Sequence, residues 1–256
     1  MPHALLIYYK PLTISLQHDK TIMKISIIIC AYNEKRTIEE AIRQAQAVEL
    51  NPGWEKEIIV VDNYSTDGTR DILQAIDDPD VHVIFHDSNR GKSASILSGF
   101  AAATGEYGLI FDADLEYEAA DIPHLVAAVT PGETVAVFGS RTMGGRKIYA
   151  YAQNYWGVRL LTQTANLLFG GQLTDIATGT KLVRLDVAHT LALSNHDFDL
   201  DFDLPAKLLK HGYEIKEVPV NYHPRTVEQG KGLAGLKAFR TGFRVLGIYL
   251  KIWLGK

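Results

Sequence analysis

The sequence predicts an α/β fold in which a mostly parallel sheet is flanked by helices. Short apolar strands alternate with helical patterns through the first half of the chain, and clusters of polar residues follow the strands. The length of 256 residues, with 46% hydrophobic and 22% charged residues, is enough to bury the core of one large domain. Right-handed crossovers would bring the polar clusters to one edge of the sheet, where α/β proteins bind ligands.

The first half alternates regularly. The expected strands and helices are strand 24–30, helix 37–48, strand 57–61, helix 69–76, strand 81–86, helix 93–104 and strand 107–111. Thr37 is the N-cap candidate of the first helix, with Glu40 at the capping-box position. Residues 62–68 are rich in turn formers, and the last strand ends directly in Asp112, Ala113 and Asp114.

The second half is less regular, and nothing in it marks a linker or repeat. The expected elements are strand 135–139, helix 151–169, strand 181–184, helix 204–211 and strand 214–220. We therefore expect one domain at 24–232, with a donor half at 24–118 and an acceptor half at 119–232. A basic amphipathic helix at 233–256 would follow. Residues 1–23 have no signal-peptide pattern and are expected to be a loose extension.

Composition excludes several classes of protein. A net charge of -4 and a pI near 6.1 argue against a nucleic-acid binder, which needs clustered positive charge. The single cysteine, Cys30, rules out an intrachain disulfide and fits a reducing cytoplasm. We expect Cys30 to be a buried strand residue. No apolar run reaches the ~18 residues that a membrane-spanning helix requires.

Asp112 and Asp114 are the strongest candidates for chemistry. Both can turn toward one point if the strand ends in a tight turn, and Glu116 can join them. Carboxylates without cysteine or imidazole suit Mg²⁺ or Mn²⁺, which usually complete their coordination with substrate phosphates. Such an ion would neutralise a departing diphosphate. The alternative for this pair alone is a solvated turn.

A series of short motifs resembles the family 2 glycosyltransferases, which have the Rossmann-like GT-A fold. The motifs are IIICAYNE (27–34), VDNYSTDGT (61–69), NRGK (89–92), FDAD (111–114), GSR (139–141), TDIATG (174–179), EVPV (217–220) and YHPR (222–225). Within the family, their order is most similar to that of the dolichyl- or polyprenyl-phosphate sugar synthases. The resemblance spans residues 24–251.

The resemblance implies a nucleotide-sugar site in the donor half. Its implied residues are Ala31, Tyr32, Glu34, Asp62, Lys92, Asp112 and Ala113. Asp62 would bond the base and Lys92 would lie near the diphosphate. Alone, Glu34 is also typical of a helix start, Asp62 and Asp67 of turn caps, and Lys92 of a solvated surface lysine. Two departures from the family pattern, Tyr64 and Ser93, suggest a differently shaped base pocket, so UDP and GDP both stay open.

For the acceptor, the resemblance implies that Arg141 meets a phosphate, to which a guanidinium fork is well suited. Arg225 and Lys231 lie in a glycine-containing basic stretch, residues 225–232, that is similar to the family's mobile loop. We expect this loop to close over substrate. A flexible surface loop is the alternative. Asp175 with Thr178 is expected to brace the site rather than contact the acceptor.

Asp199, Asp201 and Asp203 alternate with apolar residues, so an extended segment would put all three on one face. Asp201 and Asp203 are candidates for a general base or for organising the acceptor side. A phosphate acceptor is already ionised and needs little base assistance. The equal alternative is a solvated cap for the helix that is expected after Leu204.

The C-terminal helix carries apolar and basic residues at helical spacing. The apolar set is Leu233, Leu236, Phe239, Phe243, Leu246, Leu250 and Trp253, and the basic set is Lys237, Arg240, Arg244 and Lys251. Such a helix can lie in an anionic membrane interface. The alternative is a helix that packs on the domain's own core.

These observations predict an inverting glycosyltransferase that moves a sugar from a UDP- or GDP-sugar to a polyprenyl phosphate, with Mg²⁺ or Mn²⁺. It would be cytoplasmic and peripherally associated with the membrane, with Asp114, Arg141, Asp201, Asp203, Arg225 and Lys231 at the reacting groups. A homo-oligomer or a membrane partner protein stays open. The alternatives are transfer to a glycan or small-molecule hydroxyl, and a non-catalytic nucleotide-sugar-binding protein.

Overall fold

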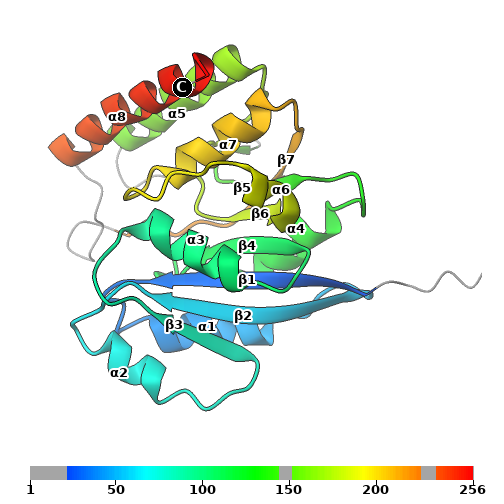
Figure 1. The fold of residues 1–256 in the computed structure, drawn as a ribbon, viewed down its shortest axis with the longest axis vertical. Helices are drawn as coiled ribbons and strands as arrows, with labels where there is room; N and C mark the ends of the chain where they lie inside the picture. Colours follow the sequence, from blue (N-terminus) through cyan, green and yellow to red (C-terminus); the bar gives the residue numbers. More distant parts are fainter. Residues whose placement is uncertain (1–21, 144–151, 226–234, 256) are drawn as a thin grey trace, which may run out of the picture.

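The computed structural model describes residues 22–143, 152–225 and 235–255. The expected N-terminal extension therefore lies almost wholly outside the described residues, and so does Lys231. Within them, seven strands form one sheet in the order β3-β2-β1-β4-β6-β5-β7, with helices on both faces (Figure 1). The α/β prediction with a mostly parallel sheet is confirmed.

The first four strands are parallel neighbours and form one half of the sheet. They are β1 (Met23–Ala31), β2 (Trp54–Asp62), β3 (Val81–Phe85) and β4 (Tyr107–Asp112). In β1, Ile27 and Ile29 face one hydrophobic cluster and Ile28 faces another, because successive strand side chains point to opposite sides. The register pairs Ala31 with Asp62 and Cys30 with Asp112, so the polar strand ends meet at one edge.

Helices cover both faces of these strands. α1 (Ile38–Ala47) packs on one face together with η1 (Ala119–Asp121) and α4 (Ile122–Ala127), and α3 (Lys92–Ala102) packs on the other. α2 (Thr69–Gln74) follows β2. The predicted capping box at α1 is wrong. The Thr37 hydroxyl donates to Glu34, and Glu40 instead binds Arg43 and Gln44 on the helix surface.

The second half of the sheet contains its only reversed strand among the described residues. β6 (Lys181–Arg184) runs antiparallel to β4 and to β5 (Ala136–Ser140), and β7 (Ile215–Pro219) runs parallel to β5. These strands were predicted from the sequence, whereas η1, α4 and α6 (Leu185–Thr190) were not. None of these three helices has more than six residues, so each shows a helical period only weakly.

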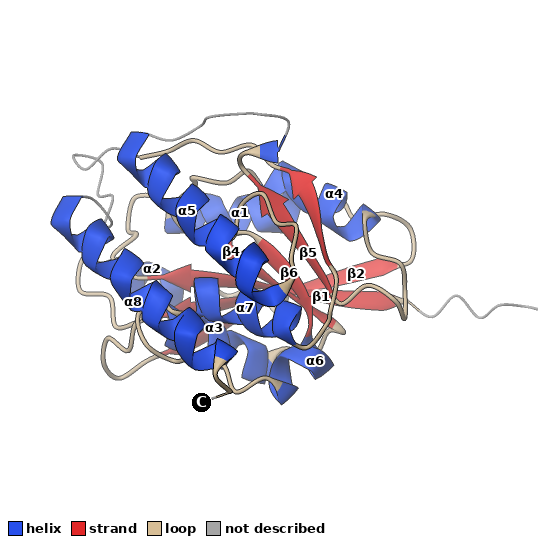
Figure 2. Ribbon diagram, turned by 90° about the horizontal axis from the view of Figure 1, so that it is seen from above, coloured by secondary structure: helices blue, strands red, loops and turns tan. Residues whose placement is uncertain are grey.

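A third layer lies over the sheet on the side of α3. α7 (Leu200–Lys210) packs on the sheet, and α5 (Ala152–Phe169) and α8 (Gly235–Trp253) lie side by side on top of it (Figures 1 and 2). Ala165, Phe202 and Tyr249 are buried where the three helices meet. One side of α8 therefore packs on the domain. None of the described helices is long and apolar enough to cross a membrane.

Candidate active site

The carboxyl ends of β1 and β4 open into a cavity of about 1690 Å³. Its walls come from the loop after β1, the end of β4, the start of α3, the start of α7 and the first halves of α5 and α8. A pocket for one small molecule usually measures roughly 300–1,000 Å³. This cavity is therefore large enough for two small ligands together.

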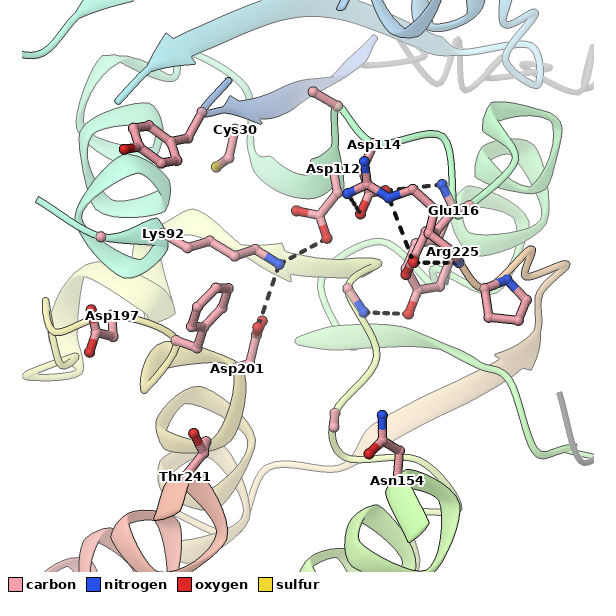
Figure 3. A pocket seen from close by; sticks show the side chains of 18 of the residues that line it. Cys30, Lys92, Asp112, Asp114, Glu116, Asn154, Asp197, Asp201, Arg225 and Thr241 are labelled. Atoms are coloured by element: carbon pink, nitrogen blue, oxygen red, sulfur yellow. Dashed lines mark hydrogen bonds and ion pairs between the residues drawn. The ribbon is translucent and has the colours of Figure 1, made fainter. Parts of the chain in front are cut away.

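Asp112, the last residue of β4, is paired with a buried lysine. The Lys92 Nζ lies 2.9 Å from the Asp112 Oδ2 and 3.5 Å from the Asp201 Oδ2, as drawn in Figure 3. On its other side, the Asp201 Oδ1 lies 3.3 Å from the Nζ of Lys181, which is fully buried. Lys181, Asp201, Lys92 and Asp112 thus form a row of alternating charges from the core to the cavity.

The pKa values follow from this row. Burial raises the pKa of Asp112, and Lys92 only partly offsets the rise. Burial acts in the same direction on Asp201, but Lys92 and Lys181 together outweigh it and hold the pKa of Asp201 below its ordinary value. Asp201 is consequently a poor proton acceptor, because its ionised form is strongly favoured.

Asp114 is paired with Arg225, which follows the last strand. The Arg225 Nη2 lies 3.0 Å from the Asp114 Oδ2, and its two terminal nitrogens each lie 3.1 Å from an oxygen of Glu34. Glu116 accepts hydrogen bonds from the Tyr222 hydroxyl at 2.6 Å and the Arg225 backbone N–H at 2.8 Å. Burial, with the charges of Asp112 and Glu116, raises the pKa of Asp114 to about 7.

Arg141, at the end of β5, is held by a buried carboxylate. Its Nε and Nη2 donate to the two oxygens of Asp175 at 2.7 and 2.8 Å, and its guanidinium lies 5.0 Å from the Tyr222 ring centre. Asp175 has no exposed surface and does not line the cavity, whereas Arg141 does. Asp175 therefore braces Arg141, as expected, and fixes the direction of a cation that faces the cavity.

The expected nucleotide-binding residues are only partly brought together. Ala31, Tyr32, Glu34, Lys92, Asp112 and Ala113 line the cavity, and Tyr32 is half exposed within it. Asp62 is fully buried and accepts a hydrogen bond from the Ser65 backbone, so it lies behind the wall. Tyr64 does not narrow the cavity, because its ring lies beside Arg70 outside it.

The three acids of the α7 segment do not share a face. The expectation of an extended segment is wrong: α7 begins at Leu200, four residues earlier than expected, so the acids diverge around a helix. Asp201 faces Lys92, Asp203 binds Lys207 and the Ser194 backbone N–H, and Asp199 binds Arg244 of α8. Only Asp201 of the three lines the cavity.

Two contributors to the site were not found from the sequence. Lys181 begins β6, and it is a fully buried lysine that precedes Leu182 and Val183, so a charged residue beside an apolar pair was an available signal. Gly179 is close to Asp112: a Cβ on Gly179 would lie 2.6 Å from the Asp112 Oδ2 and 2.8 Å from the Tyr117 ring. Gly179 lies in the quoted motif TDIATG, but its role depends on a contact that only the fold reveals.

The carboxylates at this edge fit a hard divalent cation that takes its remaining ligands from substrate and water. In the part of the chain that the structure describes, no three His, Cys, Asp or Glu side chains are grouped as a metal site. Asp112, Asp114 and Glu116 are therefore not gathered as three ready ligands, since Glu116 is bound by Tyr222 and Arg225. Two carboxylates with substrate phosphates and water nevertheless match the coordination that Mg²⁺ prefers.

Comparisons with known proteins agree with this architecture. Residues 26–191 match the family model described as Glycosyl transferase family 2. A dolichol-phosphate mannosyltransferase of Pyrococcus furiosus is 29% identical over 218 residues, which cover 82% of this chain and 59% of that protein. An undecaprenyl-phosphate mannosyltransferase of Micrococcus luteus is 27% identical over 227 residues, which cover 84% of this chain and 89% of that protein.

Solved structures with little sequence identity share the fold. A glucosyl-3-phosphoglycerate synthase of Mycobacterium tuberculosis, in complex with Mn²⁺, UDP and phosphoglyceric acid, has a TM-score of 0.68 at 18% identity. The match covers 90% of this chain and 78% of that one. A mannosyltransferase of Pyrobaculum calidifontis, in complex with GDP-Man and Mn²⁺, has a TM-score of 0.61 at 19% identity, covering 91% and 64%.

The fold and the carboxylate-lined edge define an α/β protein of the GT-A type. The chain belongs to glycosyl transferase family 2, because the family match covers more than half of its length. Curated relatives include polyprenyl-phosphate sugar transferases. The chain spans 59% of the P. furiosus protein and 51% of a hexosyltransferase of Haloferax volcanii.

Proposed function

We propose that this chain is an inverting glycosyltransferase that moves a sugar from a UDP- or GDP-sugar to the phosphate of a polyprenyl carrier at a membrane surface. The names of the curated relatives support a polyprenyl phosphate as the acceptor. Solved structures of the same fold contain Mn²⁺ with UDP or with GDP-Man, which supports a divalent ion and leaves both nucleotides open.

The observation that carries the proposal is the shape of the cavity. At one side it is lined by Asp112, Asp114 and Lys92, and at the other it reaches α5 and α8, marked by Asn154 and Thr241 in Figure 3. Beside these polar residues, that second side carries large apolar side chains, from Leu160, Leu161, Phe243 and Leu246. A substrate with a charged end and a long hydrocarbon tail matches both sides.

The outer surfaces of α5 and α8 support the proposal that this substrate comes from a membrane. Their largest exposed apolar side chains away from the cavity are Trp156, Leu167, Leu250 and Trp253. Trp156 is 64% exposed and Leu167 is 86% exposed. Arg159, Arg240 and Lys251 are exposed on the same two helices. Tryptophan and basic residues beside an apolar face are typical of helices that bind an anionic membrane interface.

The chain's own residues fit an in-line transfer. Lys92 lies where it can neutralise a diphosphate beside Asp112, and Arg141, fixed by Asp175, presents a cation to an acceptor phosphate. A divalent ion on Asp112 and Asp114, when bound, would stabilise the charge of the leaving nucleotide diphosphate. The acceptor phosphate oxygen attacks the anomeric carbon as the bond to the diphosphate breaks, which inverts the configuration.

The protonation of the site favours a phosphate acceptor over a hydroxyl. A hydroxyl would need a general base, and Asp201 is held ionised between Lys92 and Lys181. Asp203 does not line the cavity and is bound to Lys207. Neither candidate base is therefore suited to accept a proton, whereas a phosphate monoester needs none.

The experiment is transfer of radiolabelled sugar with Mn²⁺ and detergent-dispersed polyprenyl phosphate. Label should pass into organic solvent only when the phosphorylated lipid is present, and the unphosphorylated polyprenol should accept none. The double variant Asp112→Asn with Asp114→Asn should lose transfer. Equal transfer to a soluble glycan would favour the hydroxyl acceptor, and folded protein that binds donor without turnover would favour a non-catalytic binding protein.

A further inference from the structure

Arg225 bridges two sides of the cavity that the donor diphosphate and its metal would have to share. Its guanidinium lies between Glu34, which follows β1, and Asp114, which follows β4. Its backbone N–H donates to Glu116, so the residue is anchored from behind. The contacts come from segments 191 and 111 residues away in sequence, which means that the folded site, not the local chain, sets this position.

The single positive charge of the guanidinium faces several carboxylates, and one of its hydrogen-bond donors has no acceptor within the described residues. It faces the carboxylates of Glu34, Asp114 and Glu116, while Asp112 adds a further negative charge beside Asp114. The Arg225 Nε is buried and has no hydrogen-bond partner within the described residues, since the nearest Glu116 oxygen is 3.8 Å away. A buried unpaired donor is costly, which indicates that this donor has a partner in another state of the site.

We propose that Arg225 occupies Asp114 in place of the metal when the donor is absent, and releases it when the metal and the diphosphate bind together. This inference rests on the proposed function, which places a divalent ion on the same carboxylate. The Asp114 Oδ2 that contacts Arg225 is an oxygen that the ion would need, and two cations on one oxygen repel each other.

The diphosphate gives Arg225 a new partner. While Glu34 still holds one side of the guanidinium, the Nη2 that leaves Asp114 and the unpaired Nε are free to donate to phosphate oxygens. Metal alone must displace Arg225 from Asp114 and gives its guanidinium no new hydrogen-bond acceptor. Metal with nucleotide supplies phosphate oxygens as acceptors. Metal and nucleotide should consequently bind cooperatively, and each should strengthen the other by the same factor.

The test is a titration of the full chain with Mn²⁺, with and without UDP or GDP. The electron paramagnetic resonance signal of the free ion measures how much Mn²⁺ is bound. No sugar or acceptor is present. The wild type should bind Mn²⁺ about tenfold more tightly when its nucleotide is present. Arg225→Gln should bind Mn²⁺ alone about tenfold more tightly than the wild type and lose most of the nucleotide effect. Arg225→Lys should lie between them.

Arg43→Gln is the matched control, because Arg43 is exposed on α1 and, among the described residues, pairs with neighbouring Glu40. It removes the same charge from a residue that does not line the cavity, and it should bind Mn²⁺ as the wild type does. Unfolding temperatures of all variants check the fold. If nucleotide tightens Mn²⁺ binding but Arg225→Gln and Arg225→Lys do not, this inference fails and the proposed function stands. If Mn²⁺ does not bind even with nucleotide, both fail.

Discussion

Asp201 lies between two lysines, and its carboxylate offsets the charge of Lys181 and, together with Asp112, that of Lys92. Its two oxygens lie 3.5 Å from the Lys92 Nζ and 3.3 Å from the Lys181 Nζ. Burial lowers the pKa of Lys181, whereas Asp112 and Asp201 outweigh burial at Lys92 and raise its pKa. Asp201 therefore helps to hold the Lys92 ammonium group beside Asp112 at the cavity wall.

Replacing Asp201 by Asn should destabilise the protein strongly. The change leaves the fully buried Lys181 ammonium group without its carboxylate, while Lys92 keeps Asp112, and breaking a buried ion pair in this way costs about 3 kcal/mol or more. Urea unfolding at pH 7 measures the loss. The double variant Asp201→Asn with Lys181→Met should recover a large part of it, because the buried charge that lost its partner is gone. A double variant no more stable than Asp201→Asn would contradict this account.

Glu57 stabilises the opposite, amino-terminal part of the sheet in a pH-dependent way. Burial alone would raise the pKa of Glu57, but hydrogen bonds from Lys24, Ser26 and Thr104 outweigh it and lower the pKa from 4.5 to about 2. Because the pKa is lower in the folded state, the stabilisation is complete above pH 4.5. It is lost as the pH falls toward 2.

Glu57→Gln should therefore be less stable than the wild type at pH 7 by about 1 kcal/mol, the scale of a hydrogen bond to a charged group. The difference should shrink steadily below pH 4.5 and vanish near pH 2. Urea unfolding of both proteins at pH 7, 4 and 3 provides the measurement. A gap that stays constant down to pH 3 would show that the charge of Glu57 is not involved.

Individual elements differ in how closely they approach the sheet, and two helical glycines reveal it. A Cβ on Gly99 in α3 would overlap the side chain of Ile28 in β1, so α3 packs with its backbone almost on the strand. Gly247 in α8 has nothing near a Cβ, because it lies on the exposed side of the helix. The same substitution should consequently have opposite effects in the two helices.

Gly99→Ala should lower the free energy of unfolding by about 1–3 kcal/mol through overpacking. Gly247→Ala should raise it by about 1 kcal/mol, because alanine loses less backbone entropy in a helix. Thermal or urea unfolding of the two variants beside the wild type tests both signs. If Gly99→Ala were stabilising, the close packing of α3 on β1 would be wrong.

The periodic elements were predictable from sequence, and the contacts between distant segments were not. The strand and helix order up to β4 follows from runs such as residues 24–30, and the meeting of Ala31 and Asp112 at one edge follows from parallel register. The antiparallel direction of β6 could not be predicted, because no local sequence pattern indicates it. The α7 start was misplaced because Asp201 and Asp203 alternate with apolar residues as in a strand, while burial in tertiary contacts favours a helix.

The candidate site was predictable in its residue types but not in its pairings. Asp112, Asp114, Lys92 and Arg141 all line the cavity, as the motifs indicate. That Arg225 reaches Glu34, and that Asp201 reaches Lys92, depends on side chains from segments more than 100 residues apart. Spacing along the chain carries no information on such contacts. For the same reason Asp62 was expected in the cavity, although the turn at Ser65 buries it.

In the whole molecule, the layer formed by α5 and α8 (Figures 1 and 2) has one side packed on the domain and one side exposed. Its inner side shares a hydrophobic cluster with α7, through Leu161, Ala206 and Val245 among others. Its outer side exposes large apolar residues, and residues of both helices line the cavity. A membrane that contacted this outer side would present lipid directly to the cavity.

This arrangement makes point variants a better test of membrane binding than truncation. Removing α8 would expose the cluster around Tyr249 and Ile252, so loss of binding could reflect unfolding. The four substitutions Trp156→Ala, Leu167→Ala, Leu250→Ala and Trp253→Ala remove only exposed apolar surface, and no one of these residues lines the cavity. The fold and the cavity should stay intact in this variant. Unchanged binding of a soluble nucleotide would verify this.

The wild type should co-sediment with vesicles that contain anionic lipid, and binding should weaken at high salt because part of it comes from basic residues. The fourfold variant should bind at least tenfold more weakly, since each buried apolar side chain contributes about 1.5–3 kcal/mol at full burial. Ile22→Ala is the control, because Ile22 is also exposed but directly precedes β1 and belongs to neither α5 nor α8. Equal sedimentation of the fourfold variant and the wild type would mean that another surface meets the membrane. The polyprenyl tail would then have to enter the cavity by a route that avoids α5 and α8.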